Sequence, residues 1–506
     1  MYYDHSSERR DVPYHPPRTP NYDVPLTSES INGVFADCAD LQAREIFVGG
    51  QPTLSAQSFF LDGLVSGSEV AEDVLRPLTS AVRFGQVRDA AEALELMRAS
   101  LVYGASSKKC STMDEAVSAL LNGFCLIVFD SLQTAVAFEA RTSNHRSISD
   151  PSSEQSLKGA RDSFVETLRI STSLVRRHLR NPALKLISLT VGRKSNTAAE
   201  LAYVDGVADP ATVELLRQRL DNIDIDGLIT TTALEEYISD APRSPFPQLM
   251  STERPDRFCL NLLEGRVGLL VDGIPQGWLL PATMSQQLRV PDDVSKHFAV
   301  ASVLTFLRHL ALLITILFPA AYVAVAMYHQ EMIPTKLLLS VIESKQQVPF
   351  STAMEVLGML IAFELLQEAG LRLPSSIGET VSIIGALIVG QSAVEAKVIS
   401  PIAVIVVATA GIAGYTIPNQ DLGEALRLTR FGLVVAAILG GMFGIAAGCV
   451  LLIYHLCTLD SFGIAYLSPL ADGGSWAALR ALFQPPLHSC KCRDPKLHTP
   501  DRRKQK

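Results

Sequence analysis

The sequence has little charge and carries no signature of catalysis. Only 19% of its 506 residues are charged and 48% are hydrophobic, with a mean hydropathy of +0.22, which argues against an intrinsically disordered chain. The patterns GxxxxGK(S/T), GxSxG, HExxH and a GxGxxG after a strand are all absent, so we expect no enzyme and no cofactor. The eight cysteines include no CxxC pair, which indicates free thiols in a reducing compartment. We also expect no metal site.

The few charges are distributed unevenly along the chain. The net charge is −10 over residues 1–297, −2 over 298–457 and +4 over 458–506. An acidic first region argues against nucleic acid as its partner, since phosphate binding needs a basic surface. The first thirty residues are polar and rich in proline and tyrosine, with no apolar run that could act as a secretory signal. We therefore expect residues 1–297 to be cytoplasmic, with a disordered leader over 1–40.

The acidic region contains an internal duplication. Residues 45–65 align with 188–208 at an offset of 143, and residues 122–131 align with 264–273 at an offset of 142. Each half shows short strands that end in turns of Asp-Gly type, with helical stretches over 90–101 and 211–220. We interpret the aspartates of these turns as acceptors of local backbone hydrogen bonds rather than as general acids or metal ligands: Asp62, Asp205, Asp130 and Asp272.

Residues 298–457 form a membrane block. Apolar runs without charge cover 310–328, 380–394, 398–420 and 431–459, and a crossing needs about 20 apolar residues. A fifth apolar segment, 350–366, carries Glu355 and Glu364 on opposite faces, so we expect it to lie among other helices or at the interface without crossing. Eight Lys or Arg residues in the tail predict that it is cytoplasmic. Four crossings satisfy this orientation and leave the loop with Arg427 and Arg430 outside.

Two groups of residues inside the membrane block are functional candidates. Glu364, Gln391 and Glu395 are polar at membrane depth and are predicted to line a pore or cavity, although Glu395 could instead pair with Lys397 or lie at the headgroups. Small residues recur every four positions in the last span and predict a helix-packing ridge, either within one subunit or between subunits around a pore. The ridge consists of Gly432, Ala436, Gly440, Gly444 and Gly448.

Six motifs occur in an order that resembles one family. They are SPFPQ (244–248), TERPD (252–256), LLEGRVGLLVDG (262–273), HQEMIPT (329–335), EAGLRLP (368–374) and SIIGALIVGQSAVEA (382–396). From about residue 41 to residue 470 the chain resembles the A subunit of GerA-type spore germinant receptors. In HQEMIPT, Pro334 ends helical continuation, and His329 and Glu331 are expected at the interface, where they could cap a helix, pair or contact a partner. The leader and the basic tail after Pro485 lie outside the resemblance.

The resemblance implies a non-enzymatic membrane subunit of a nutrient-sensing complex in the spore inner membrane or cell membrane. It implies a transporter-like B subunit and a C lipoprotein as partners, a homo-oligomer of A subunits, and an oligomeric ligand-gated ion channel that triggers germination. The alternative is a transporter-like subunit that binds the germinant itself. We expect an α/β cytosolic region of two related subdomains and an all-α polytopic transmembrane domain. The boundaries are 1–40 (leader), 41–141 (subdomain 1), 142–160 (linker), 161–297 (subdomain 2), 298–457 (membrane domain) and 458–506 (tail).

Overall fold

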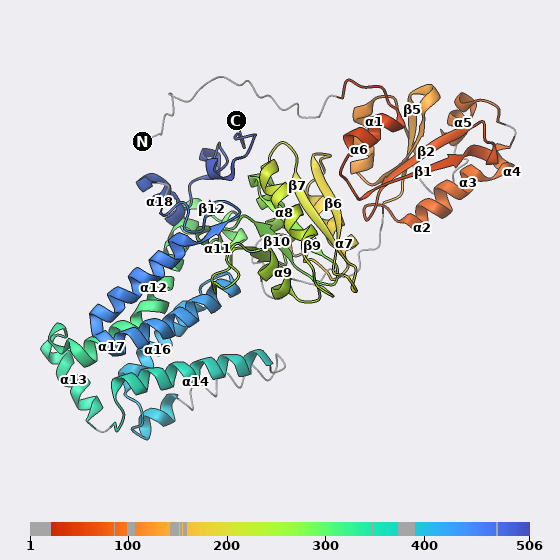
Figure 1. The fold of residues 1–506 in the computed structure, drawn as a ribbon. Helices are drawn as coiled ribbons and strands as arrows, with labels where there is room; N and C mark the ends of the chain where they lie inside the picture. Colours follow the sequence, from red (N-terminus) through yellow and green to blue (C-terminus); the bar gives the residue numbers. More distant parts are fainter. Residues whose placement is uncertain are drawn as a thin grey trace.

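The computed structural model describes residues 22–85, 87–98, 107–141, 151, 154, 159–346, 348–372, 390–471 and 474–505. Along the chain, two sheet-containing subdomains are followed by a helical region, and the chain then returns to the second subdomain (Figure 1). We refer to residues 22–141 as subdomain 1, to residues 159–297 as subdomain 2, and to residues 298–458 as the helical region.

Subdomain 1 is built on a five-stranded antiparallel sheet of order β1-β2-β4-β5-β3. Its central strands β4 and β5 are apolar along nearly their whole length because both of their faces are buried. The strands are β1 (Leu41–Phe47), β2 (Ser55–Leu61), β3 (Ser107–Cys110), β4 (Phe124–Phe129) and β5 (Thr134–Glu139). The helices are α1 (Ser28–Val34), α2 (Gly67–Glu69), α3 (Arg76–Thr79), α4 (Ala81–Phe84), α5 (Ala90–Leu96) and α6 (Met113–Leu121), with a π-helical turn over Val70–Leu75.

Subdomain 2 repeats this topology, with the order β6-β7-β9-β10-β8. The pairing register repeats as well: Leu41 faces Leu61 in the first sheet, and Leu184 faces Val204 in the second, both shifted by 143. The expected duplication is therefore visible in the backbone. The strands are β6 (Leu184–Val191), β7 (Thr197–Val204), β8 (Met250–Thr252), β9 (Val267–Val271) and β10 (Gly277–Leu280), and the helices are α7 (Leu168–His178), α8 (Pro210–Asp221), α9 (Thr231–Ile238), α10 (Pro255–Glu264) and α11 (Met284–Gln287).

Asp130 and Asp272 accept hydrogen bonds from distant parts of the chain, whereas local backbone hydrogen bonds were expected. Asp130 accepts hydrogen bonds from the backbone N–H and the hydroxyl of Ser28 at 2.7 and 2.9 Å, and Asp272 accepts one from the backbone N–H of Leu168 at 3.0 Å. Ser28 begins α1 and Leu168 begins α7, so each carboxylate satisfies the free N–H groups at the first helix of its own subdomain. These bonds are made across the fold, not within the turn.

The expected disordered leader is wrong for residues 22–40. Thr27 caps α1 by accepting from the N–H of Ser30, and Leu26, Ile31 and Phe35 are buried in the core of subdomain 1. The polar composition of residues 1–30 concealed this apolar set because it is spaced by four and five residues over a short stretch. Residues 1–21 lie outside the described residues, as does most of the predicted linker 142–160.

The helical region contains five helices whose bounds are described in full, and residues 390–395 are helical as well. The five helices are α12 (Phe298–Tyr328), α13 (Thr335–Lys345), α14 (Thr352–Arg372), α16 (Pro401–Gly414) and α17 (Gln420–Thr458). Of these, α12 and α17 are long and apolar enough to cross a membrane. Beyond α17 the described chain forms the hairpin β11–β12 (Asp460–Ser461 and Ile464–Ala465), helix α18 (Gly474–Leu482) and two short 3₁₀ turns (Leu487–Ser489 and Pro495–Leu497).

Helix α17 is a hairpin of two arms, not one straight span. Gly441 has φ 57° and ψ −137°, which interrupts the helix. A Cβ at Gly448 would lie 2.7 Å from a side-chain methyl of Leu433, although these positions would be about 22 Å apart in a straight helix. The chain therefore reverses at Gly441, and its arms (420–440 and 442–458) run antiparallel. Tyr328, the last residue of α12, packs on Gly441 and donates a hydrogen bond to the Ile438 carbonyl oxygen at 2.5 Å.

This reversal changes the expected pattern of crossings. The run 431–459 does not form a single span, and Arg427 and Arg430 lie within the first arm of α17 rather than in an external loop. The run 398–420 forms the short helix α16, and most of the run 380–394 lies outside the described residues. Both ends of the helical region lie beside subdomain 2, since Arg308 donates to the Leu288 carbonyl oxygen and His455 meets Ser244. We therefore expect an even number of crossings, with α14 crossing if the run 380–394 crosses as the sequence predicts.

The pH dependence of subdomain 2 provides a first prediction. Burial, reinforced by the nearby Asp40, raises the pKa of Glu200 on β7 from 4.5 to about 7. The folded state therefore loses stability as the pH rises above 4.5, and the loss is complete once Glu200 is ionised above pH 7. Glu200→Gln should raise the unfolding temperature at pH 8 and change it little at pH 4.5. Fluorescence of the buried Trp278, in a Trp476→Phe background, reports the transition. Glu236→Gln, an exposed control on α9, should show no such pH dependence.

The crossing of α14 is tested by cysteine labelling. In a background with the other cysteines replaced, Ser351→Cys and Arg372→Cys mark the two ends of α14, and native Cys457 marks the side of subdomain 2. A membrane-impermeant maleimide should label position 372 from the same side as Cys457, and position 351 from the opposite side. Labelling of both positions from one side would show that α14 does not cross.

Candidate functional site

The helical region holds a charged centre where α14 meets the first arm of α17. The carboxylate of Glu364 on α14 forms an ion pair with the NH2 group of Arg430 and approaches the NH1 group of Arg427 at 3.5 Å. The Arg430 side chain is only 1% exposed, whereas that of Glu364 is 25% exposed. Arg430 lies about 15 Å from each end of its arm, which places the pair halfway along the hairpin.

The local sequence explains why these charges lie inside. On α17, Leu426, Leu433 and Val434 recur at helical spacing around Arg430 and are all buried, so the face that carries Arg430 is the packed face. On α14, Val356 and Leu360 are fully buried, and Glu364 continues their row at a spacing of four. Packing of these two faces therefore brings the carboxylate to the guanidinium.

The electrostatics of this centre favour the paired state strongly. A single charge at the middle of a bilayer costs about 2.5–3.5 kcal/mol on insertion scales, and more when it is fully buried and unpaired. Two guanidinium groups share one carboxylate here, and Arg427 also lies 3.9 Å from Glu424 one turn earlier. The Nε of Arg430 is buried without a hydrogen-bond partner among the described residues. The formal charges of these two arginines and two glutamates therefore cancel, and one guanidinium donor is left unused.

A second polar centre surrounds Glu355, nine residues before Glu364 on α14. Its carboxylate accepts a hydrogen bond from the backbone N–H of Ser400 at 2.8 Å and lies 3.7 Å from Nζ of Lys345. Ser400 is the N-cap of α16, so the positive end of that helix faces the carboxylate. The sequence placed Glu355 and Glu364 on opposite faces, and the structure gives each face its own cationic or dipolar partner.

The other predicted polar candidates lie apart from this centre. Gln391 donates to the Glu395 carboxylate at 3.3 Å, one helical turn away, and both side chains are exposed. Among the described contacts, neither of them touches Glu364 or Arg430. The segment just before them, 373–389, lies outside the described residues.

The five small residues do not form one ridge. The reversal at Gly441 places Gly432, Ala436 and Gly440 on the first arm, and Gly444 and Gly448 on the second. A Cβ at Gly444 would overlap the Ala436 carbonyl oxygen, and one at Gly448 would lie 3.7 Å from the Ala436 methyl group. Small side chains therefore allow close packing of the two arms within one subunit.

The HQEMIPT segment lies at the far end of α12. His329 follows the last residue of α12, its Nδ1 lies 3.5 Å from Glu331, and the Glu331 side chain is 74% exposed. Pro334 is the N-cap of α13, which agrees with a helix stop before it. Gln330, Ile333 and Val341 line a shallow hollow here between α12 and α13.

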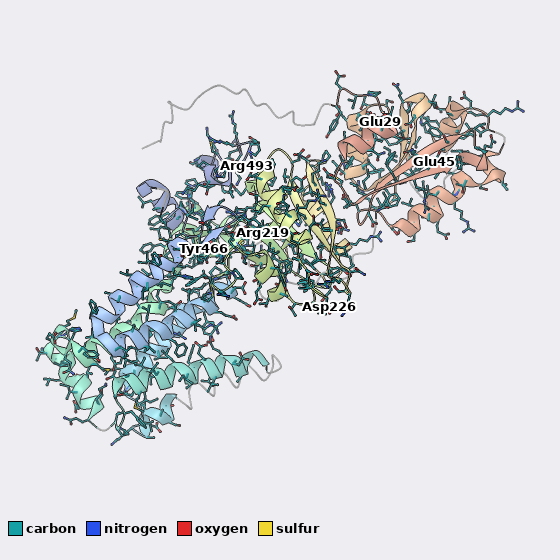
Figure 2. All side chains as sticks on the ribbon, viewed as in Figure 1. Glu29, Glu45, Arg219, Asp226, Tyr466 and Arg493 are labelled. Atoms are coloured by element: carbon teal, nitrogen blue, oxygen red, sulfur yellow. The ribbon has the colours of Figure 1, made fainter. Side chains whose placement is uncertain are left out.

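Two sequence motifs form the junction between subdomain 2 and the helices. In SPFPQ, the Ser244 hydroxyl lies 2.9 Å from Nε2 of His455 near the end of α17. The Phe246 ring centroid lies 6.0 Å from that of His455 and 6.4 Å from that of Tyr466 (Figure 2 labels Tyr466). Just after it, Ser251 donates to Asp421 at the start of α17 at 3.2 Å. Both arms of the hairpin therefore end against subdomain 2.

The second junction motif, TERPD, supplies a buried guanidinium. Arg254 makes a bidentate pair with Asp256 at 2.7 and 3.0 Å and a further pair with Asp292 at 2.9 Å. The adjacent Asp293 pairs with Arg308 of α12. A chain of charged pairs thus runs from α10 of subdomain 2 into the first turns of α12.

Sequence reasoning missed Arg430 because a charge-free run was required for a span. The available signal was the helical spacing of Leu426, Leu433 and Val434 around it. Within the described ranges, no group of three or more His, Cys, Asp or Glu side chains is arranged to hold a metal ion. Cys490 and Cys492 are free thiols.

Two sheet-bearing subdomains joined to long apolar helices define a membrane protein with a large extramembrane region. The family model described as Bacillus/Clostridium GerA spore germination protein matches residues 29–496. The chain belongs to the GerA family of spore germination proteins and is a germinant receptor A subunit.

Several relatives are similar over most of their length. Spore germination protein KA of Bacillus subtilis (strain 168) is 36% identical over 88% of this chain and 82% of its own. Spore germination protein GerLA of Bacillus cereus is 33% identical, over 85% and 87%. The uncharacterized membrane protein YfkQ of B. subtilis (strain 168) is 36% identical, over 90% and 87%. The crystal structure of the N-terminal domain of the A subunit of the Bacillus megaterium germinant receptor GerK3 matches with 28% identity and a TM-score of 0.41, over 51% of this chain and 93% of that one.

Removal of one partner from the charged centre should destabilise the helical region. Glu364→Gln leaves Arg430 buried without its counter-charge, which is expected to cost about 3 kcal/mol. The double variant Glu364→Gln/Arg430→Met removes both charges and should be more stable than Glu364→Gln alone. The temperature at which detergent-solubilised protein loses its monodisperse peak measures both effects. Glu343→Gln, exposed on α13, is the control, and strictly additive effects of the two substitutions would contradict the pairing.

Proposed function

We propose that this A subunit forms an oligomeric ion channel in the spore inner membrane or cell membrane, which opens when the germinant receptor senses a nutrient. The observation that carries the proposal is the Glu364–Arg430–Arg427 centre, buried halfway along the α17 hairpin. Ionisable groups at that depth are retained where an ion or a moving charge must be accommodated. Glu364 is one quarter exposed, so its carboxylate also has a face directed away from Arg430.

The proposed assembly includes other receptor subunits. Family A subunits act in germinant receptor complexes, and we propose a transporter-like B subunit and a C lipoprotein as the partners, together with other copies of this chain and membrane lipid. The exposed His329–Glu331–Pro334 segment at the end of α12 is a candidate contact for one of them. Gln391 and Glu395, exposed in this single chain, become lining residues only if neighbouring copies enclose them.

The position of the tail supports a cytoplasmic orientation for the subdomains. Its basic residues and both subdomains lie at the same end of the helical region, so the positive-inside rule would place all of them in the cytoplasm. A signal from a nutrient bound on the opposite side of the membrane would then be transmitted to the subdomains through the helices. The junction motifs SPFPQ and TERPD are the route by which the helices contact subdomain 2.

A second candidate function is direct binding of the germinant by this subunit. The Gly441 reversal and the start of α16 beside Glu355 resemble the interrupted helices with which transporters form substrate sites. Binding of radiolabelled nutrient to the purified A subunit alone would favour this alternative, whereas the channel proposal predicts that the A subunit alone binds none.

Ion release from spores tests the channel. The charge-balanced double variant Glu364→Gln/Arg430→Gln avoids an unpaired buried charge, and it should slow nutrient-triggered cation release at least about tenfold if it removes about 1.4 kcal/mol of stabilisation from the conducting state. Gln391→Ala should slow release to a lesser degree. Immunoblots must show normal protein levels, and Glu343→Gln is the matched control. Unchanged release in both variants would remove these residues from the mechanism.

A further inference from the structure

The C-terminal tail, residues 487–505, packs on subdomain 2. The N–H of Asp501 donates to the Gly206 carbonyl oxygen at 3.2 Å, and Nε of Arg493 donates to the Leu263 carbonyl oxygen at 2.7 Å (Figure 2 labels Arg493). Lys504 forms an ion pair with Glu264. Thr499 is buried against Gly265, where a Cβ on that glycine would overlap its methyl group. The tail therefore covers the two turns at 204–207 and 263–265.

Subdomain 1 has the same pair of turns, and a different element covers them. Arg169 of α7 pairs with Asp62, and Arg180, just beyond α7, donates to the Asn122 side chain at 3.1 Å. A Cβ at Gly63 would lie 2.6 Å from Cβ of Ser173, so α7 lies directly on this turn. Here the first helix of subdomain 2 is the covering element.

The two covered surfaces are equivalent by the internal duplication. Gly63 corresponds to Gly206 at the offset of 143, and Asn122 corresponds to Glu264 at the offset of 142. Both glycines have positive φ, 82° and 75°, so the two turns are alike at this position. The tail thus occupies, on the second repeat, the surface that the next repeat occupies on the first.

Charge explains why the tail is suited to this position. The surface of subdomain 1 receives arginines of α7, and the surface of subdomain 2, with Glu264 and Asp205, receives Lys504 from the basic tail. The helix α1 of a second copy would bring Glu29 instead, because Ser28 and Leu168 are the equivalent capped residues and Glu29 therefore corresponds to Arg169. Glu29 of the second copy would then face Asp205, and repulsion between the two carboxylates disfavours a second copy at this surface.

The tail is also fixed to the helical region. The Phe483 ring at the end of α18 stacks on Phe306 of α12, with 5.8 Å between centroids. The Ser302 hydroxyl of α12 donates to the Gln484 carbonyl oxygen at 2.9 Å. A single segment therefore contacts the first turns of α12 and, a few residues later, the outer turns of subdomain 2.

We propose that residues 483–505 are a latch. Residues 487–505 take the place of a third repeat on subdomain 2, and Phe483 and Gln484 fasten this segment to the start of α12. The Lys504–Glu264 pair is the charge-dependent part of the latch, and Arg493 holds its fold through bonds to Asp501 at 2.9 Å. This proposal rests on the fold and the duplication, and it is independent of ion conduction.

Hydrogen exchange of the full-length protein in detergent micelles tests the latch. Lys504→Glu places two acids together. It should speed exchange of the Asp501 amide, and of peptides that cover 491–504, about two- to fivefold, the range expected for a partly exposed ion pair. The charge-swapped double variant Glu264→Lys/Lys504→Glu should return exchange to the native rate. Arg502→Glu is the matched control, since the same charge change falls on an exposed side chain that shows no ion pair within the described ranges.

Three outcomes would overturn the latch. The first is unchanged exchange in Lys504→Glu. The second is an equal effect of Arg502→Glu, which would show that general positive charge, rather than the Glu264 contact, holds the tail. The third is faster exchange after transfer of the native protein from neutral to anionic lipid nanodiscs, which would show that the basic tail prefers the membrane surface.

Discussion

The need to neutralise Arg430 determines how the helical region packs. Its guanidinium is buried halfway along an apolar arm, where it is tolerated only beside a counter-charge, so Glu364 and with it α14 must lie against α17. The next contacts follow from that placement: Phe363 packs on Gly411 of α16, and Glu355, further back on α14, meets the N-terminus of the same helix. This electrostatic constraint therefore acts together with the shared apolar core of α14, α16 and α17 to order the three helices.

Subdomains 1 and 2 show why the duplicated fold has two repeats and does not add a third. The sheets share strand order and register, yet the surfaces that join them have diverged. Arg176 of α7 pairs with Asp40 at 2.8 and 2.9 Å in a nearly dry contact, whereas the equivalent position after α1 is Ala36. A pair so buried is sensitive to loss of either partner and gives the contact its specificity. The first repeat therefore lacks the arginines with which it could dock on another copy, and the array ends with the second repeat.

The sequence predicted well those features that depend on local pattern. Strand positions and the duplication follow from apolar spacing and Asp-Gly turns, which the backbone imposes locally. The Gly441 reversal could not be predicted, because apolar residues and small residues spaced by four continue on both sides of it, and a glycine within such a pattern is usually tolerated by a straight helix. Arg430 was wrongly predicted to lie in an external loop for a related reason. Its partner Glu364 lies 66 residues away in the sequence, so a search for charge-free spans does not detect an ion pair that forms only in the folded protein.

The reversal has a mechanical consequence that a straight span would not have. Because α17 returns at Gly441, both of its ends contact the segment 244–251 of subdomain 2, while its tip meets the end of α12 at Tyr328. The first turns of α12 are tied to the same subdomain through Arg308 and Asp293. Subdomain 2 thus contacts both ends of α17 and the beginning of α12. A rotation of subdomain 2 must therefore move the two arms of α17, either together or relative to one another. Arg430 lies on one arm and its carboxylate partner on α14, so a shift of that arm relative to α14 would strain the ion pair, and the pair opposes such a motion.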